Sequence, residues 1–353
     1  MAIIYNQIGS LTELIGKLNY RGIDSINSLS DAISFKKNYN TNIDKIKLNK
    51  KIDLINLIVG LKKKLDQLSV DYDVSLKLEG EKLTNEKNKI NDWLNKYNEK
   101  YKNLFFVVLN FYKHYKWQKR LKVLENNFRE EQKRLCSKLA LELSSVKFEI
   151  EDRESYPDKY VDELSKEEID HLKEINIALE ANKEFFYGAL GEDSALAVLK
   201  NLPDSYKVIN DFHLFFKRPV YDKKNNDRIY SVQIDHLVVG PAGLFIVETK
   251  NWSLSSIKKS DFFSPVKQLN RANFALFCYL NNNDNYYLSS FIQEWGRQQI
   301  SPKNVILMIN NKPAVEYPHV KILSLYEINN YIMRGKDVFS GIQVDQLVNF
   351  LNR

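Results

Sequence analysis

The feature that most constrains the fold is a pair of apolar runs joined by a tight turn, within Ser231–Ser253 (SVQIDHLVVGPAGLFIVETKNWS). The joining residues 240–243 are Gly-Pro-Ala-Gly, a turn composition, and the run on each side has the apolar content of a buried strand. Side chains two residues apart on a strand point to the same face. Polar residues with this spacing are Gln233 and Asp235 in the first run and Glu248 and Lys250 in the second. The sequence therefore predicts a β-hairpin with four polar groups in a segment that otherwise belongs to the core.

The charged members of this group need a partner, because burying an unpaired charge is costly. A divalent cation between the two carboxylates, with the ammonium group beside it, is one arrangement that satisfies them. Hard oxygen ligands of this kind suit Mg²⁺ or Mn²⁺. A plain Asp–Lys or Glu–Lys ion pair at the end of an ordinary hairpin is the other arrangement, and the strand pattern alone leaves both open.

A family resemblance favours the metal interpretation. Asp235, followed after a glycine-containing turn by Glu248-Thr249-Lys250, resembles the D…(D/E)xK core of the PD-(D/E)xK restriction-endonuclease-like nucleases, and more narrowly the nuclease-related domain, NERD. Upstream, Gly188-Ala189-Leu190-Gly191-Glu192 opens a helical pattern, as the first helix of that family does. Downstream, Ser264-Pro265-Val266-Lys267-Gln268-Leu269 resembles the family's Pro-x-x-Gln helix start. The order of these three motifs, between about Gly188 and Leu280, is the specific part of the resemblance.

The chemistry of the cluster suggests a role for each group. Asp235 and Glu248 would bind one or two Mg²⁺ or Mn²⁺ ions, with the Thr249 carbonyl as a further candidate ligand. The metal would lower the pKa of a bound water and neutralise charge that builds on a scissile phosphate. Lys250 would orient or deprotonate that water. His236 alternates to the face opposite Asp235, so we expect it to be a structural histidine.

Residues outside the hairpin extend the expected site. By the resemblance, Glu192 adds a catalytic and metal-binding carboxylate, although an acid in the first turn of a helix is also favoured by the macrodipole alone. Gln233 and Gln268 are expected to hold water or a phosphate, and Gln268 can equally be a surface residue of its helix. Lys267 and Arg271 lie close to Gln268 in sequence and are candidates for contacting the backbone of a nucleic acid.

The first part of the chain, residues 1–180, is expected to be a long all-α, coiled-coil-like region. Glu81–Tyr156 contains neither Gly nor Pro and carries apolar residues at helical spacing, which predicts a long helical hairpin or a coiled coil. Glu131 and Lys138 interrupt the apolar seam, so a folded-back bundle and a parallel dimer both remain open. We expect a break in the helical pattern at Asp71–Gly80.

Residues 181–353 are expected to form an α/β domain. After the first helix, Tyr206–Phe216 is a strand candidate, a charged loop follows at Lys217–Arg228, and the two central strands come next. Further helical and apolar runs complete an order that fits a restriction-endonuclease-like fold, a mixed central sheet flanked by helices, which the resemblance also implies.

The apolar run Leu104–Tyr112 is too short to cross a membrane, which takes about 20 residues. It is followed by a lysine-rich stretch with interleaved aromatic residues. A buried helix face followed by a solvated one is the favoured interpretation, over an interfacial membrane contact or a nucleic-acid-binding stripe. We therefore expect no membrane partner.

Composition and cysteine usage set broader limits. The formal net charge of +7 would help a polyanionic partner approach. Cys136 and Cys278 lie far apart and indicate neither a disulfide framework nor a zinc site. With no targeting signal in the first residues, they favour a cytoplasmic location.

Together these observations favour a metal-dependent nuclease that hydrolyses phosphodiester bonds of DNA rather than RNA. Its helical region would serve oligomerisation, DNA binding or a protein partner, in genome defence or repair. The alternative is a non-catalytic scaffold or nucleic-acid-binding protein with a nuclease-like fold. The joint presence of Asp235, Glu248 and Lys250 favours the enzyme, because a binding module does not need all three.

Overall fold

The computed structural model describes residues 1–99, 104–252, 263–281 and 299–352. The chain divides into two compact units. The first, which we call the sheet unit, combines Met1–Tyr39 with Lys173–Arg353, and the second, the hairpin unit, is Asn40–Leu172.

The sheet unit contains a six-stranded mixed sheet whose strands lie in sequence order. Its strands are β1 (Ile3–Tyr5), β2 (Lys207–Asp222), β3 (Asp227–Gly240), β4 (Gly243–Lys250), β5 (Lys303–Met308) and β6 (Val320–Ser324). β2, β3 and β4 pair antiparallel, whereas β1 with β2, β4 with β5 and β5 with β6 are parallel. The expected hairpin is confirmed, and the predicted loop at 217–228 is shorter because β2 and β3 extend into it.

Helices cover both faces of this sheet. One core cluster packs the sheet against α9 (Phe263–Leu280) and α12 (Gly341–Leu351). The other packs it against α1 (Gly9–Tyr20), α7 (Lys183–Leu199) and α11 (Ile328–Met333). The α/β class with helices flanking a mixed central sheet is therefore confirmed.

The turn between β3 and β4 depends on its two glycines. Gly240 pairs with Gly243, and Gly243 has a φ of +123°, a conformation that side-chain-bearing residues rarely adopt. A Cβ at Gly240 would lie 2.1 Å from the ring of Tyr206. These glycines allow the tight hairpin and so define the register between the two strands.

The first 39 residues belong to the sheet unit, whereas the sequence analysis placed them in a helical region ending at residue 180. Ile3 pairs with Lys207, so β1 forms an edge of the sheet. α1 buries Leu14 and Leu18 completely within the core cluster that also holds α7. A three-residue strand has no periodic signal of its own, and its pairing partner lies about 200 residues away in the chain.

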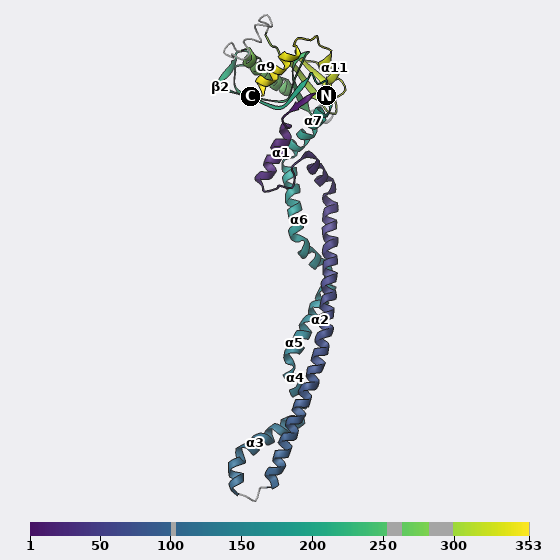
Figure 1. The fold of residues 1–353 in the computed structure, drawn as a ribbon, viewed down its shortest axis with the longest axis vertical. Coiled ribbons are helices and arrows are strands. Elements are labelled where there is room, and N and C mark those ends of the chain that lie inside the picture. Colours follow the sequence, from purple (N-terminus) through teal and green to yellow (C-terminus); the bar gives the residue numbers. More distant parts are fainter. Residues whose placement is uncertain (100–103, 253–262, 282–298, 353) are drawn as a thin grey trace. The chain divides into compact units, whose positions relative to one another are not determined.

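The hairpin unit folds back on itself. The long helix α2 (Leu29–Glu99) enters this unit, and α3 (Leu104–Asn126), α4 (Phe128–Leu135), α5 (Ser137–Ser155) and α6 (Pro157–Ala181) return along it (Figure 1). Leu124 of α3 packs against Leu83, Ile90 and Leu94 of α2, and Val146 and Ile150 of α5 pack against Leu68. The apolar seam is thus filled within one chain, as the folded-back interpretation expects, while assembly into an oligomer remains a prediction.

The break expected at Asp71–Gly80 is wrong, because α2 continues through it. Gly80 serves close packing instead. A Cβ there would lie 2.8 Å from Nε2 of Gln132, which donates a hydrogen bond to the Leu76 carbonyl. The glycine thus lets a side chain of the returning helix α4 reach the backbone of α2.

The buried helix face expected at Leu104–Tyr112 falls partly outside the described side chains, because those of residues 104, 106 and 107 are not among them. Phe105, Val108, Phe111 and Tyr112 are each at least 66% exposed. None of the described helices has the length and apolar content needed to cross a bilayer. The run therefore leaves an apolar surface on α3.

We predict that Leu14→Ala destabilises the sheet unit by about 2–5 kcal/mol, because it opens a cavity where a buried leucine lies. Chemical denaturation of the full chain measures this change. The control is Tyr20→Ala on the same helix, where the side chain is 94% exposed. Equal effects of the two substitutions would show that α1 does not pack as described.

Candidate functional site

The end of the β3–β4 hairpin brings together the polar residues of the motif. The pairing of β3 with β4 ends at His236 and Val247. Asp235 and Glu248 are the next residues on the two strands, so they are adjacent just beyond that pair. Oδ2 of Asp235 accepts hydrogen bonds from the Thr249 backbone N–H at 2.7 Å and from Thr249 Oγ1 at 2.8 Å. The Asp235 carboxylate is thus oriented by the neighbouring strand.

Glu248 and Lys250 form a buried ion pair, with 2.7 Å between Lys250 Nζ and Glu248 Oε1. Burial and the nearby charge of Asp235 raise the pKa of Glu248, and Lys250 only partly offsets them. Burial lowers the pKa of Lys250, but the surrounding carboxylates outweigh it and the net pKa is raised. Lys250 is therefore held as an ammonium ion within a site rich in negative charge.

Glu192, from the middle of α7, completes the acidic group. Its Oε1 accepts a hydrogen bond from Ser10 Oγ, and its Oε2 accepts one from the Ser10 backbone N–H at 3.2 Å. Burial and the charge of Asp235 raise the pKa of Glu192 to about 7. Because α7 begins at Lys183, a first-turn acid is not the explanation for this residue.

Two glycines of α7 allow these contacts. A Cβ at Gly188 would lie 2.6 Å from Ser10 Oγ, and one at Gly191 would lie 3.1 Å from Cβ of Asn251. α1 and the end of β4 can therefore approach α7 closely. Close packing therefore explains why glycine occupies the two positions of the motif that precede Glu192.

A cavity of about 410 Å³ opens beside this acidic group. Its lining residues are Gly9, Ser10, Glu13, Phe185, Glu192, Gln233, Asp235 and Gln268. Two of the acidic side chains and both glutamines expected from the sequence thus face one space. Part of its wall comes from α1, which the sequence analysis did not connect with the site.

Asp211 is a fourth carboxylate near the site that the sequence analysis missed. Its Oδ1 accepts a hydrogen bond from Gln233 Nε2 at 2.7 Å and lies 2.9 Å from His213 Nε2. It also contributes to the raised pKa of Glu192. Its φ of +49° is uncommon within a strand, and an Asn-Asp pair inside an apolar strand run was the available signal.

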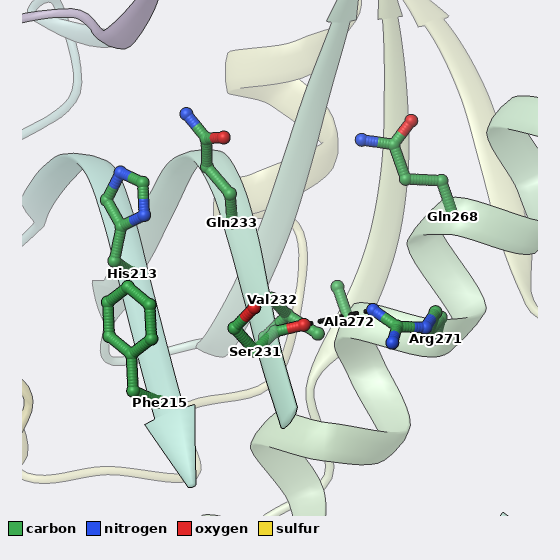
Figure 2. Close-up of a pocket in the computed structure, with 8 residues that line it drawn as sticks. All are labelled: His213, Phe215, Ser231, Val232, Gln233, Gln268, Arg271 and Ala272. Atoms are coloured by element: carbon green, nitrogen blue, oxygen red, sulfur yellow. Dashed lines mark hydrogen bonds between the residues drawn. The ribbon is translucent and has the colours of Figure 1, made fainter. Parts of the chain in front are cut away.

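The two residues expected to bind the nucleic-acid backbone, Arg271 and Lys267, have different surroundings. Arg271 donates hydrogen bonds to Asp227 Oδ2 at 2.7 Å and to the Ser231 carbonyl at 3.0 Å. It lines a second cavity, of about 230 Å³, between β2, β3 and α9 (Figure 2). Lys267 is exposed on α9 and is not among the residues that line either cavity.

His236 has the structural role expected of it. The side chain is completely buried, and its Nδ1 lies 2.7 Å from Oδ1 of Asn210. Burial lowers its pKa to about 4, so the ring is neutral near pH 7.

The donor set suits a hard divalent cation, because it offers carboxylate oxygens from Glu192, Asp235 and Glu248. Within the described parts of the chain, no three His, Cys, Asp or Glu side chains are grouped closely enough to hold a metal ion. Each of the three carboxylates accepts a hydrogen bond from the protein instead. A shared ion would therefore require these side chains to move closer together.

We predict that Glu192 makes the sheet unit less stable as pH rises. Its folded-state pKa of about 7 exceeds the ordinary 4.5, so stability present below pH 4.5 is lost between about pH 4.5 and 7. In Glu192→Gln this loss should shrink, by on the order of 2–3 kcal/mol. Denaturation from pH 4.5 to 8 in EDTA measures it, with Glu316→Gln, at an exposed position, as the matched control. An identical pH dependence in wild type and Glu192→Gln would contradict the prediction.

Comparison with known proteins identifies the segment that holds the acidic group. Residues 187–293 match the family model of the nuclease-related domain, NERD. No curated protein and no solved structure gives a match to the chain. The matched segment includes Glu192, Asp235, Glu248 and Lys250, whereas Ser10 lies outside it. The chain therefore contains a segment that matches the nuclease-related domain, and Ser10 of the N-terminal helix α1 binds Glu192 from outside that segment.

Proposed function

We propose that this protein is a metal-dependent nuclease that hydrolyses phosphodiester bonds, with DNA as the expected substrate. The observation that carries the proposal is the buried acidic group within the NERD segment. Three carboxylates and one ammonium group lie close together, with Glu192 and Asp235 lining the cavity, and burial together with mutual repulsion raises the pKa of Glu192 and Glu248. A divalent cation would relieve that repulsion.

Asp235, Glu248 and Glu192, with the Thr249 carbonyl, are the residues that would hold Mg²⁺ or Mn²⁺. When bound, the metal would lower the pKa of a water molecule and neutralise charge on the phosphate. Lys250 is an ammonium ion in its present surroundings, which suits orienting the water and offsetting phosphate charge better than removing a proton. Of the two roles expected for Lys250, the carboxylates around it therefore favour orienting the water over deprotonating it.

Gln233 and Gln268 line the cavity from β3 and α9, so their amides can hold a water molecule or a phosphate oxygen. Arg271, paired with Asp227, places a guanidinium group at the cavity that Gln268 also lines. Lys267, exposed on the same helix, would contact the nucleic-acid backbone farther from the cavity. The net charge of +7 favours approach of such a polyanion.

The hairpin unit supports a second part of the proposal. Its exposed apolar run on α3 suits a protein partner or a second copy of the chain. A role in genome defence or repair would use such a partner. Cys136 and Cys278 are both free thiols, as a reducing cytoplasm would keep them.

We predict that purified protein degrades plasmid DNA with Mg²⁺ or Mn²⁺ and does not in EDTA. Asp235→Ala should abolish cleavage, because it removes a carboxylate from the proposed metal site. Lys250→Ala should slow cleavage by roughly 10²–10³, because it removes the ammonium that offsets charge beside the reacting groups. Gel assays with DNA and RNA measure these rates and the choice of nucleic acid.

The matched control is Lys321→Ala, an exposed lysine on the edge strand β6, which should cleave as wild type does. Thermal unfolding of each variant separates lost chemistry from lost folding.

The competing function is a non-catalytic nucleic-acid-binding scaffold. It is favoured by the present partners of the carboxylates, which leave no grouped metal ligands among the described residues. Nucleic-acid binding without cleavage in any metal would support that scaffold and reject the nuclease.

A further inference from the structure

The second cavity continues the candidate site in one direction. It is lined by His213 and Phe215 of β2, Ser231, Val232 and Gln233 of β3, and Gln268, Arg271 and Ala272 of α9 (Figure 2). Gln233 and Gln268 also line the cavity beside the acidic group. Since the two cavities share these residues, they adjoin one another.

One wall of the second cavity is an exposed aromatic pair. The rings of His213 and Phe215 lie on the same side of β2, with centroids 6.0 Å apart and planes that differ by 5° (Figure 2). Phe215 is 73% exposed, which is a large apolar area to leave in water. Such a face suits a planar ligand that can stack on it.

The aromatic pair is tied to the candidate site by hydrogen bonds. Oδ1 of Asp211 lies 2.9 Å from His213 Nε2 and accepts a hydrogen bond from Gln233 Nε2 at 2.7 Å. One carboxylate oxygen therefore fixes both the imidazole of the pair and an amide that borders both cavities. This wall is preorganised relative to the acidic group.

The opposite wall is polar and carries a guanidinium group. Arg271 is held by Asp227 and by the Ser231 carbonyl, and it projects from α9 beside Gln268 (Figure 2). Amide and guanidinium groups are the donors that proteins commonly present to base edges and phosphates. The cavity thus pairs a stacking surface with hydrogen-bonding groups, which is the combination that nucleobases require.

We propose that this second cavity binds an unpaired nucleobase beside the phosphate held at the acidic group. The substrate class is therefore single-stranded or locally unpaired nucleic acid. In a duplex, neighbouring pairs cover both faces of each base, so only an unstacked base can lie on Phe215. The inference rests on the proposed function, because it extends the same groove.

The test measures binding, so that it does not depend on cleavage. Fluorescence anisotropy of a labelled single-stranded oligothymidylate, with EDTA present, gives the affinity of each variant of the full chain. Loss of one base–aromatic stack should weaken binding of Phe215→Ala by about 5- to 100-fold. Phe215→Tyr, which retains a stacking ring, should bind within about twofold of wild type.

Two controls separate stacking from general effects. Tyr326→Ala removes a ring that is 94% exposed before α11, and it should leave the affinity unchanged. An oligonucleotide of the same length with abasic sites should bind wild type weakly and should lose little further affinity in Phe215→Ala. A blunt duplex of the same length should also be insensitive to Phe215→Ala.

The outcomes distinguish this inference from the proposed function. Binding that depends on Phe215 in a protein that never cleaves would support the base site and reject the nuclease. Metal-dependent cleavage combined with wild-type single-strand affinity in Phe215→Ala would support the nuclease and overturn the base site. Equal losses for the single strand, the duplex and the abasic strand would also overturn it, because stacking on a base could not then be the cause.

Discussion

The structure of the candidate site depends on keeping like charges close together where water is largely excluded. Glu248 is 3% exposed and Glu192 is 5% exposed, and the charge of Asp235 acts on both. Bringing these groups together costs free energy, which Lys250 and the hydrogen bonds from Ser10 and Thr249 only partly offset. A cluster that opposes folding in this way is more easily explained by a ligand than by stability.

The sheet is what holds this arrangement in place. The glycine turn between β3 and β4 defines their register, and a slip by one residue would send Asp235 to the other face. The helices then close the site from both faces, α7 with Glu192 and α9 with Gln268. The part of the chain that matches the family model is therefore incomplete by itself, because Ser10 and the N-terminal helix bind Glu192 from outside that segment.

The groove also connects two kinds of chemistry. At one end, carboxylates and an ammonium group suit a phosphate with its metal ion, and at the other, Phe215 and His213 suit a flat ring. Asp211 links them through Gln233 and His213. A nucleotide carries both a phosphate and a base, which makes a nucleic-acid strand the ligand that best fits the whole groove.

The amino-acid sequence alone determined the β-hairpin, the alternation that gathers Asp235, Glu248 and Lys250, and the helical character of α2, because these depend on residues near one another in the chain. Only the tertiary structure decided the pairing of β1 with β2, the contact of Ser10 with Glu192, the packing role of Gly80 and the exposure of Phe105. Each of these depends on which distant segment lies beside the residue. Local periodicity reports which face of a helix or strand is apolar, and it carries no information about the partner that covers that face.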